Sequence, residues 1–430
     1  GESASEASAA PVTVDGCDVE VSDSDGALGS SEIGPVGSAS HVEVKKVGND
    51  CVLIFLEPMV EMEWTFPDYL EEMHVLVVGG GGAGSAAGGG GGGYYDTYSD
   101  PNNPPLAIPA SASSATIRVG RGGNAPSSNG DGENGADSGI IFSSYSGQPQ
   151  DLLFDGGTGT PKDPTVSEDA VVMAGGGGGS RETGRGRNGG SGGGSVNSGT
   201  SGQNGGSALK DQSNNRFGNS GGGANGCSLG NGGGGGGGAG DSGGKPSLGN
   251  EPCDKKWGGV GGPGKTSGIT GLDVGYAGGG GGAFEGGGAV RGASDGGGEG
   301  DNGGNADMDG TDGLGGGGGG EFVTGQAGDG GSGVVVVRYA PPPVEPAPVL
   351  GDVTRTDGGF RVPVVNAGEY AGEYSGSVAL SASVTLGEDL GEPSSPVVEI
   401  DGVGSGSFPV LVSGLSDPPV VSVTGLDPGE

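Results

Sequence analysis

Glycine is concentrated in one long stretch of this chain. Between Gly79 and Gly333 about one residue in three is glycine, well above ordinary usage. Glycine has no Cβ and loses more conformational freedom on folding than other residues, so the stretch favours neither helices nor ordinary strands. It has no strict three-residue repeat, which excludes a collagen triple helix. The glycines instead form blocks, the longest being Gly79–Gly82, Gly88–Gly93, Gly175–Gly179, Gly232–Gly238, Gly278–Gly282 and Gly315–Gly320.

Two interpretations fit such blocks. One is a flexible Gly/Ser linker. The other is a bundle of extended, left-handed polyglycine II helices, which have no internal hydrogen bonds and so leave every amide and carbonyl free for a neighbouring segment. Without side chains these segments also approach closely enough for Cα–H···O contacts. The many separate blocks and their turn-like spacers favour the ordered bundle.

Composition narrows the functional class. The 430 residues suffice for two or three domains, but only 30% are hydrophobic and 5% aromatic, which disfavours a large conventional core. A net charge of −36 disfavours binding to nucleic acid or to an anionic membrane, and favours solubility and divalent cations. Since no apolar run approaches about 18 residues, we expect no direct membrane insertion.

The four cysteines, Cys17, Cys51, Cys227 and Cys253, indicate an extracellular protein. Their even number, wide spacing and lack of a Cys-x-x-Cys pair favour disulfides over a zinc site. The simplest pairing is local, Cys17 with Cys51 and Cys227 with Cys253. Three pairings are possible in principle, and four buried free thiols are the alternative.

Changes in composition divide the chain into five parts. We expect a flexible tail (1–10), an N-terminal β module (11–63), the glycine-rich domain (64–339), a proline-rich linker (340–349) and an immunoglobulin-like β-sandwich (350–430). The N-terminal strands are predicted at Pro11–Val14, Val19–Val21, Val42–Val47 and Cys51–Leu56. Within the glycine-rich domain they are predicted at Ala115–Val119, Ile140–Phe142, Leu152–Phe154 and Ala170–Met173, and in the C-terminal part at Phe360–Val365, Ser377–Leu386, Val397–Ile400, Phe408–Val412 and Val420–Val423.

Two valine-rich runs bound the glycine stretch. Val75–Val78 enters it and Val334–Val337 leaves it. We predict that the two runs lie in one sheet and close the domain, with glycine segments running out and back between them. The fold class is therefore mainly β with a polyglycine II bundle.

The two ends of this domain carry a resemblance. Trp64-Thr65-Phe66-Pro67 followed by Val75-Leu76-Val77-Val78 and four glycines resembles the start of a bacterial and phage glycine-rich domain family. The end, Gly330-Gly331-Ser332-Gly333 followed by four valines and Arg338-Tyr339, is similar to the family's typical end. The resemblance covers roughly residues 64–339. It implies surface proteins and tail-fibre adhesins in which polyglycine II bundles stand on a β base and loops at the rod tips touch a receptor.

Gly79, Gly81 and Gly84 match the dinucleotide-binding pattern Gly-x-Gly-x-x-Gly after an apolar strand. That motif needs a following helix, whose N-terminus holds the pyrophosphate. Ser85-Ala86-Ala87 is followed by six glycines, on which no helix persists. We therefore expect no nucleotide and no organic cofactor.

Asn305, Asp307, Asp309 and Gly310 copy the opening of a calcium-binding loop. The twelfth position should be a bidentate Glu but is Gly316, so acidic surface turns are the favoured interpretation and calcium the alternative. The two histidines, His41 and His74, have no neighbouring pattern for nucleophilic catalysis. We therefore predict no catalytic site and no enzyme activity.

Aromatic and basic islands between the glycine blocks are the candidate ligand contacts. They are Tyr94, Tyr95, Tyr98, Asn102 and Asn103, then Arg181, Arg185 and Arg187, and finally Lys256 and Trp257. Tyrosines beside asparagines suit stacking on sugars or contact with a protein. The alternative is that these side chains cover the flanks of the bundle itself.

These features predict a non-enzymatic extracellular surface or fibre protein that acts as a rigid scaffold and adhesin. Its partner would be a host or cell-surface receptor, either glycan or protein, and not nucleic acid. The alternative is a self-assembling structural subunit of an extracellular filament, with homo-oligomer neighbours.

Overall fold

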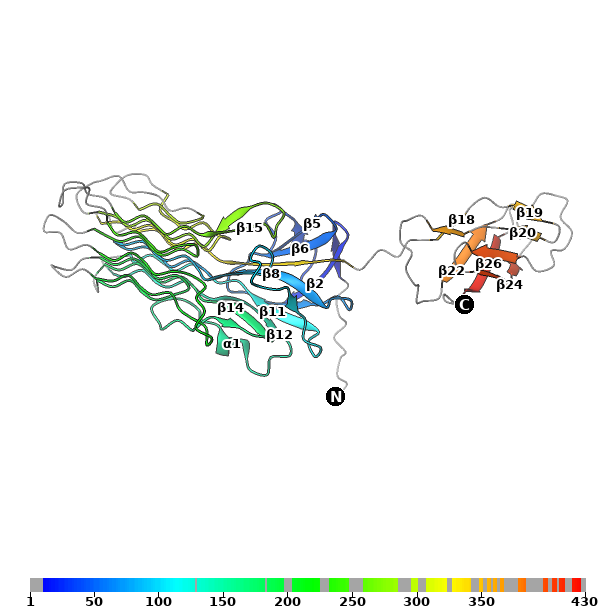
Figure 1. The fold of residues 1–430 in the computed structure, drawn as a ribbon, viewed down its shortest axis with the longest axis horizontal. Coiled ribbons are helices and arrows are strands. Elements are labelled where there is room, and N and C mark those ends of the chain that lie inside the picture. Colours follow the sequence, from blue (N-terminus) through cyan, green and yellow to red (C-terminus); the bar gives the residue numbers. More distant parts are fainter. Residues whose placement is uncertain are drawn as a thin grey trace. The chain divides into compact units, whose positions relative to one another are not determined.

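A computed structural model describes most of the first 341 residues and the strands beyond them (Figure 1). The chain has two compact units, one ending at Pro341 and one beginning at Pro342. The described residues are 11–127, 130–181, 184–196, 203–224, 232–246, 258–284, 295–300, 307–322, 327–341 and the backbone of the C-terminal strands. Their secondary structure is mainly β, as predicted.

Two facing sheets form the base of the first unit (Figure 1). The described strands of the first sheet are β1 (Val12–Val14), β2 (Cys17–Asp23), β7 (Glu61–Thr65), β11 (Ser114–Arg118), β12 (Ser138–Phe142), β14 (Ala170–Met173) and β13 (Thr165–Val166) in spatial order, with β3 (Gly26–Ala27) beside β2. Those of the second are β10 (Leu106–Ala107), β8 (Glu72–Val78), β17 (Val334–Tyr339), β6 (Asp50–Phe55), β5 (Val42–Val47) and β4 (Ile33–Pro35), with β9 (Tyr94–Asp96) beside β8.

The valine-rich runs are the centre of the second sheet. Val78 lies opposite Val334, and Val75 lies opposite Val337, in the antiparallel pair β8–β17. The prediction that the two runs share one sheet is confirmed. One face of this pair packs against the first sheet, in a core that includes Trp64. The other face packs against Ile269 and the hairpin of β15 (Lys265–Ser267) and β16 (Val274–Tyr276). Burial on both faces explains why the runs are apolar without alternation.

Strands before and after residue 63, the predicted end of an N-terminal module, share both sheets. β2 pairs with β7, which pairs with β11, and β6 pairs with β17. The predicted strands are present, except at Leu152–Phe154, where the prediction was wrong. Leu152 ends the short helix α1 (Pro149–Leu152), and the backbone of Phe154 bonds to Asp137 rather than to a strand ladder.

The glycine blocks continue from the strands as extended segments that lie side by side (Figure 1). The run Gly79–Gly84 follows β8, and its amides bond to three neighbouring segments in rotation, so that every third residue returns to the same neighbour. The donor and acceptor pairs, at 2.8–3.0 Å, are Gly79 and Gly82 to Gly93 and Gly90, Gly80 and Ala83 to Ala136 and Glu133, and Gly81 and Gly84 to Gly331 and Gly328.

Other blocks repeat this three-residue period. The amides of Gly88–Gly93 bond to Gly234 and Gly237, to Gly318 and Gly315, and to Gly177 and Ala174. The segment from Gly233 to Gly238 and the one from Gly278 to Ala283 follow the same rule with their own three neighbours. The blocks are therefore one hydrogen-bonded bundle and do not form a linker.

Close approach of the segments requires glycine inside the bundle. A Cβ atom on Gly81 would lie 1.9 Å from the carbonyl oxygen of Gly316, and one on Gly89 would lie 2.0 Å from that of Gly82. These contacts are with backbone atoms, which cannot swing aside as a flexible side chain can. Backbone hydrogen bonding thus replaces side-chain packing as the contact between segments.

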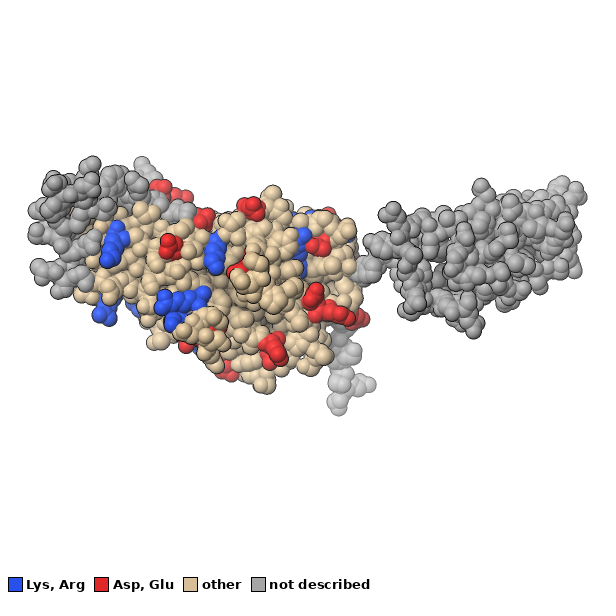
Figure 2. Space-filling view, viewed as in Figure 1, with Lys and Arg blue, Asp and Glu red and all other residues tan. Residues whose placement is uncertain are grey.

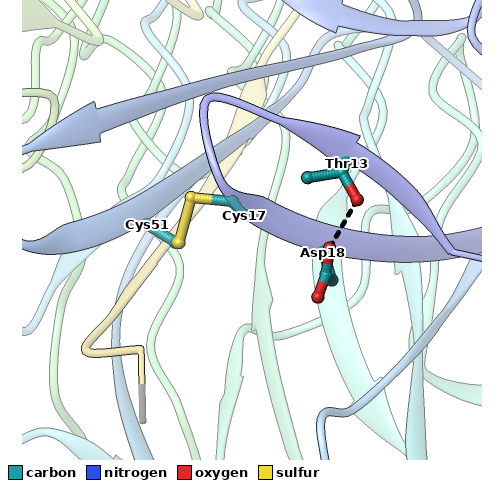
Figure 3. The surroundings of a disulfide bond; sticks show 4 residues. All are labelled: Thr13, Cys17, Asp18 and Cys51. Atoms are coloured by element: carbon teal, nitrogen blue, oxygen red, sulfur yellow. Dashed lines mark hydrogen bonds between the residues drawn. A yellow bond between two sulfur atoms is a disulfide. The ribbon is translucent and has the colours of Figure 1, made fainter. Parts of the chain in front are cut away.

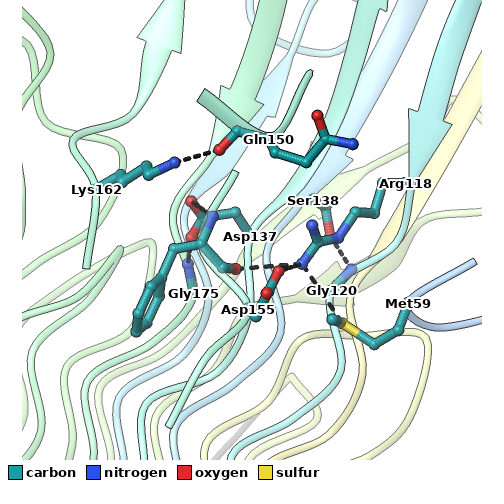
Figure 4. Close-up of polar contacts among 10 residues, drawn as sticks. Met59, Arg118, Gly120, Asp137, Ser138, Gln150, Asp155, Lys162 and Gly175 are labelled. Atoms are coloured by element: carbon teal, nitrogen blue, oxygen red, sulfur yellow. Dashed lines mark hydrogen bonds and ion pairs between the residues drawn. The ribbon is translucent and has the colours of Figure 1, made fainter. Parts of the chain in front are cut away.

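Two side chains take the place of backbone acceptors where the bundle meets the first sheet, and Figure 4 shows one of them, Asp137. The Oδ1 atom of Asn134 accepts the amide of Gly178, and Oδ1 of Asp137 accepts that of Gly175, both at 2.9 Å. The Oδ2 atom of Asp137 accepts the amide of Phe154 at 2.9 Å. Asp137 is fully buried, and burial raises its pKa to about 7, while these two amides and the charges of Arg118 and Lys162 act in the opposite direction.

A disulfide joins Cys17 of β2 to Cys51 of β6, with a Cα–Cα distance of 5.9 Å, and so links the two sheets (Figure 3). This local pairing was predicted and is confirmed. Cys227 and Cys253 lie outside the described residues. Beside the bridge, the hydroxyl of Thr13 donates to Asp18 across β1 and β2.

The double substitution Cys17→Ser and Cys51→Ser is expected to lower the free energy of unfolding by about 2–4 kcal/mol, because the bridge closes a loop between residues 34 positions apart. Urea denaturation of the oxidised protein and the variant measures this difference. Repeating both curves with a reductant is the control, since any effect on the variant reports a disulfide other than Cys17–Cys51. Equal midpoints for the oxidised protein and the variant would contradict the expectation.

The described residues of the C-terminal unit form short strands, and each of the five predicted runs overlaps at least one of them. Among the described residues, one sheet has the order β18 (Pro348–Leu350), β21 (Val364–Asn366), β23 (Val397–Ile400) and β24 (Gly404–Ser407). A second has the order β22 (Val378–Ser383), β26 (Val420–Leu426) and β25 (Val410–Ser413), and β19 (Thr354–Thr356) pairs with β20 (Gly359–Arg361).

A candidate binding surface around Tyr98

The loop that follows β9 is built on one buried carboxylate. Asp96 is 1% exposed, and its Oδ1 atom accepts the amides of Tyr98 at 2.7 Å and Ser99 at 3.0 Å. Its Oδ2 atom accepts the hydroxyl of Tyr94 at 2.8 Å, and its carbonyl accepts the side-chain amide of Asn103 at 3.0 Å. An aspartate that bonds to amides two and three residues ahead fixes a tight turn. The loop from 97 to 103 is therefore held in one conformation.

Tyr98 lies on this loop with its ring fixed and partly exposed. The guanidinium carbon of Arg338 is 4.3 Å from the ring centroid, and the ring of His74 meets it edge-on at 5.2 Å. Arg338 is itself held, because its Nε atom donates to Asp50 at 2.8 Å and Nη1 donates to the carbonyl of Ile269 at 3.3 Å. Tyr98 nevertheless remains 40% exposed, so the stack presents aromatic surface to solvent.

The β15–β16 hairpin completes the surface. The amide of Gly268 donates to the hydroxyl of Ser99 at 2.9 Å, and the hydroxyl of Tyr94 contacts the carbonyl of Thr266 at 3.2 Å. These bonds join two loops that are about 170 residues apart in the chain. At the tip of the hairpin Leu272 is 70% exposed. Tyr98, Asn102 and Leu272 together are called the Tyr98 surface below.

The predicted aromatic island is divided between interior and surface. Tyr94 and Tyr95 are buried, and Tyr95 packs edge-on against Phe217. Burial, with the nearby charge of Asp96, raises the pKa of Tyr94 well above its usual value. Asn103 is half-buried, whereas Asn102 is exposed and donates to Asp100 at 2.9 Å. Tyr98 and Asn102 are thus available to a ligand, and the other three support them.

Two of the three predicted arginines, Arg181 and Arg187, donate to backbone carbonyls of the first unit. Arg181 donates to the carbonyls of Glu321 and Phe322, at 3.2 and 3.0 Å, and Arg187 donates to those of Gly132 and Thr158, at 2.9 and 3.2 Å. Arg185 is exposed and donates to Gln203 at 3.4 Å. On the face in Figure 2 acidic and basic side chains are interspersed over the described surface.

The remaining predicted contacts, Lys256 and Trp257, lie outside the described residues, as does Asn305 of the calcium pattern. Asp309 accepts the amide of Asp329, and the carbonyl of Asp307 accepts that of Glu299, at 2.8 and 2.9 Å. Within the described part of the chain, no three His, Cys, Asp or Glu side chains are grouped to hold a metal ion. The calcium site stays a prediction.

Sequence reasoning missed three residues of this region, Asp96, Leu272 and Arg338. Asp96 directly follows the two buried tyrosines, and a carboxylate at the start of a Tyr-Ser-Asp-Pro turn was the available signal. Arg338 was known only as part of the family's terminal pattern. Arg338 comes near Tyr98, and the hairpin of Leu272 joins the Tyr98 loop through Gly268, by tertiary pairing alone, which the local sequence does not report.

A second recess lies on another flank, between the segment from 151 to 165 and residues 188, 209 and 212. It has a volume of about 580 Å³, and its wall of described residues carries no aromatic side chain. It offers proline, leucine, polar and charged side chains, Lys162 among them, but no aromatic ring for stacking in its described wall. The Tyr98 surface is therefore the better candidate for a ligand that needs an aromatic platform.

The two histidines contact neighbouring groups of the fold, and the Gly-x-Gly-x-x-Gly pattern continues into the glycine bundle. His74 Nδ1 is 2.9 Å from the carbonyl of Thr97, and His41 Nε2 is 4.0 Å from Glu57. No helix follows Gly84, since residues 85–87 bend the chain into the next glycine run. In the described residues, no helix has the length and apolar character that crossing a bilayer requires.

Comparison with protein families gives one match, and comparison with curated proteins gives none. The matching family model is described as a glycine-rich domain and covers residues 58–340. This range runs from just before β7 to just after β17, and it includes the bundle and the Tyr98 surface. It spans well over half of the chain, which therefore belongs to the glycine-rich domain family.

Proposed function

We propose that the protein is a non-enzymatic extracellular scaffold that holds binding loops on a rigid bundle of polyglycine II-type segments. The observation that carries this proposal is the three-residue hydrogen-bonding period of the glycine runs. A helix with three residues per turn directs every third amide to the same neighbour. A β-strand would direct its amides to two neighbours, so contact with three neighbours favours the polyglycine II geometry.

Rigidity follows from the way the bundle is anchored. Each interior segment donates its amides to three others and accepts amides from further segments, and runs such as Gly79–Gly84 continue directly from strands of the sheets. A loop attached to such a framework is presented with little loss of conformational freedom when it binds, which suits an adhesin. We infer that the partner is a receptor on a cell surface, either glycan or protein.

An extracellular location is supported by the disulfide between Cys17 and Cys51, because such bonds persist outside the reducing cytoplasm. The net charge of −36 favours a soluble surface protein. We further infer that the C-terminal unit is an immunoglobulin-like module, since its short strands form sheets of mainly antiparallel pairs.

A filament subunit is the second candidate. The open edges of the two sheets at the base of the first unit are short, with two residues in each of β10 and β13 and three in each of β1 and β4. Short edges oppose the addition of strands from another copy. This favours the adhesin over a filament that grows by strand pairing.

The adhesin proposal predicts single particles that bind cells. Sedimentation and negative-stain microscopy over a hundredfold concentration range are expected to show one species, and fluorescently labelled protein is expected to bind a subset of cells in a panel. Heat-unfolded protein of the same charge is the control for non-specific adsorption. Filaments that lengthen with concentration would favour the second candidate, and absence of cell binding beyond the control would overturn adhesion.

A further inference from the structure

We propose that the Tyr98 surface is a binding site for a neutral saccharide, with the ring of Tyr98 as the stacking platform. The inference rests on the adhesin function proposed above and names the ligand class of one site. The site lies beside the sheets, because Tyr98 contacts Arg338 of β17 and His74 of β8. It is therefore separate from the ends of the glycine runs that are remote from the sheets.

The platform is fixed before the ligand arrives. Arg338 lies at 4.3 Å against the Tyr98 ring, and His74 contacts its edge, so the side chain has little freedom left to lose. The backbone beneath is held by the Asp96 carboxylate. A hexose has one face of C–H groups, and such a face stacks on an exposed aromatic ring. A fixed ring makes this contact at a low entropic cost.

Polar groups that can bind the hydroxyl groups of the sugar lie on the same loop as Tyr98. Asn102 is exposed and Asp100 is half-buried, and the Asp100 Oδ1 atom orients Asn102 through its backbone and side-chain amides, at 3.1 and 2.9 Å. A carboxylate and a carboxamide together supply both acceptors and donors, the complement of vicinal hydroxyls. The exposed Ser99 adds a third polar group between the ring and this pair.

Local charge selects a neutral ligand. The positive charge of Arg338 is matched by Asp50 at 2.8 Å, so the cation behind the ring is already paired. The exposed Lys265 of the neighbouring hairpin adds one positive charge, but Asp100 and the exposed Asp273 add two negative charges, and the whole chain carries −36. Sulfated or uronic-acid polymers would be repelled. One stacked sugar ring with two or three hydrogen bonds corresponds to a dissociation constant on the order of millimolar. A polymer that repeats the sugar binds with a higher apparent affinity.

Tyr69 provides a matched control, because it is 42% exposed and Tyr98 is 40% exposed. Affinity electrophoresis of the full chain in gels with neutral polysaccharides of glucose, mannose or galactose measures association. At least one polymer is expected to retard the protein. Tyr98→Ala should weaken that association tenfold or more, Tyr98→Phe should retain it within about twofold because the ring remains, and Tyr69→Ala should leave it unchanged.

Several outcomes would overturn the proposal. They are no retardation of the wild-type protein by any neutral polymer, equal retardation of wild type and Tyr98→Ala, and equal weakening by Tyr98→Ala and Tyr69→Ala. Cell binding separates this result from the general function. Periodate treatment destroys cell-surface sugars, and protease treatment removes cell-surface proteins. If cell binding depends on Tyr98, survives periodate and is lost after protease treatment, the receptor is a protein. The saccharide proposal is then wrong, and the adhesin proposal stands. If a polysaccharide retards the protein in the gel but the protein binds no cells, only the adhesin proposal is wrong.

Discussion

Gly89→Ala is expected to lower the midpoint of thermal unfolding by about 5–10 °C, the largest effect of any single methyl group considered for this protein. Gly89 lies within the bundle, where its amide donates to Gly318 and its carbonyl accepts from Gly280, both at 2.8 Å. The new Cβ would meet the carbonyl oxygen of Gly82 at 2.0 Å. Relief requires two hydrogen-bonded segments to separate, at a cost of about 3 kcal/mol or more. Scanning calorimetry measures the shift.

Gly29→Ala is the matched control. At Gly29 the nearest atom to an added Cβ is 3.7 Å away, an ordinary contact, and the backbone needs no positive φ. This variant should unfold within about 1 °C of the wild type, since a compatible Gly→Ala change has little effect or stabilises slightly. If Gly89→Ala and Gly29→Ala unfolded at the same temperature, the close-packed arrangement of the glycine segments would be wrong.

Raising the pH from 4 to 8 is expected to destabilise the folded state through Asp137 by about 4 kcal/mol. Burial raises the pKa of this carboxyl from 3.8 to about 7, so between these values the folded state binds a proton that the unfolded state has released. The contribution of Asp137 to stability is therefore fully present below about pH 4, falls as the pH rises from about 4 to about 7, and stays constant above that range. The charged groups around Asp137 are Arg118, Lys162 and the exposed Asp155, which pairs with Arg118 at 2.5 Å.

Comparison of variants isolates this contribution, since many other carboxyl groups titrate in so acidic a chain. The side chain at position 137 of the Asp137→Asn variant cannot ionise. The unfolding free energy of the wild type should therefore fall relative to that of Asp137→Asn as the pH rises from about 4 to about 7. Asp155→Asn removes a carboxylate whose side chain is 76% exposed beside the same arginine, and it is the matched surface control. Urea denaturation at pH 4, 5, 6, 7 and 8 gives the curves, and parallel curves for wild type and Asp137→Asn would contradict the assignment.

The sheet at the base was predictable because its signals are local. Two uninterrupted valine runs at the ends of a glycine tract indicate strands buried on both faces, and Val75–Val78 does pair with Val334–Val337. The local cysteine pairing was predictable for the same reason. Leu152–Phe154 was mistaken for a strand, because three apolar residues fit both a strand and a short helical turn begun by Pro149. Asp137 keeps Phe154 out of a strand ladder, because its carboxylate accepts the amide of Phe154 and its own amide donates to the carbonyl of Phe154.

The binding surface was predictable only in part. Tyrosines and asparagines between glycine blocks marked the correct loop, but composition does not report which ring faces solvent. Asp96 decides this, because its two carboxylate oxygens turn Tyr94 inward and the backbone of Tyr98 outward. The position of Arg338 behind Tyr98 depends on a pairing of strands that are more than 200 residues apart. No periodicity in the sequence carries that information.

The spatial order of the second sheet has a consequence for biosynthesis. β17, the last strand of the first unit, lies between β8 and β6, which precede it by more than 250 residues. β6 already pairs with β5, and β8 with β9, but the central neighbour of both is missing until Val334–Tyr339 has left the ribosome. The acceptors at Gly328 and Gly331 for the first glycine run also arrive at that late point. Folding of this unit is thus completed only after β17 has been synthesised and depends on long-range closure, so a chain released before β17 has a gap at the centre of its second sheet.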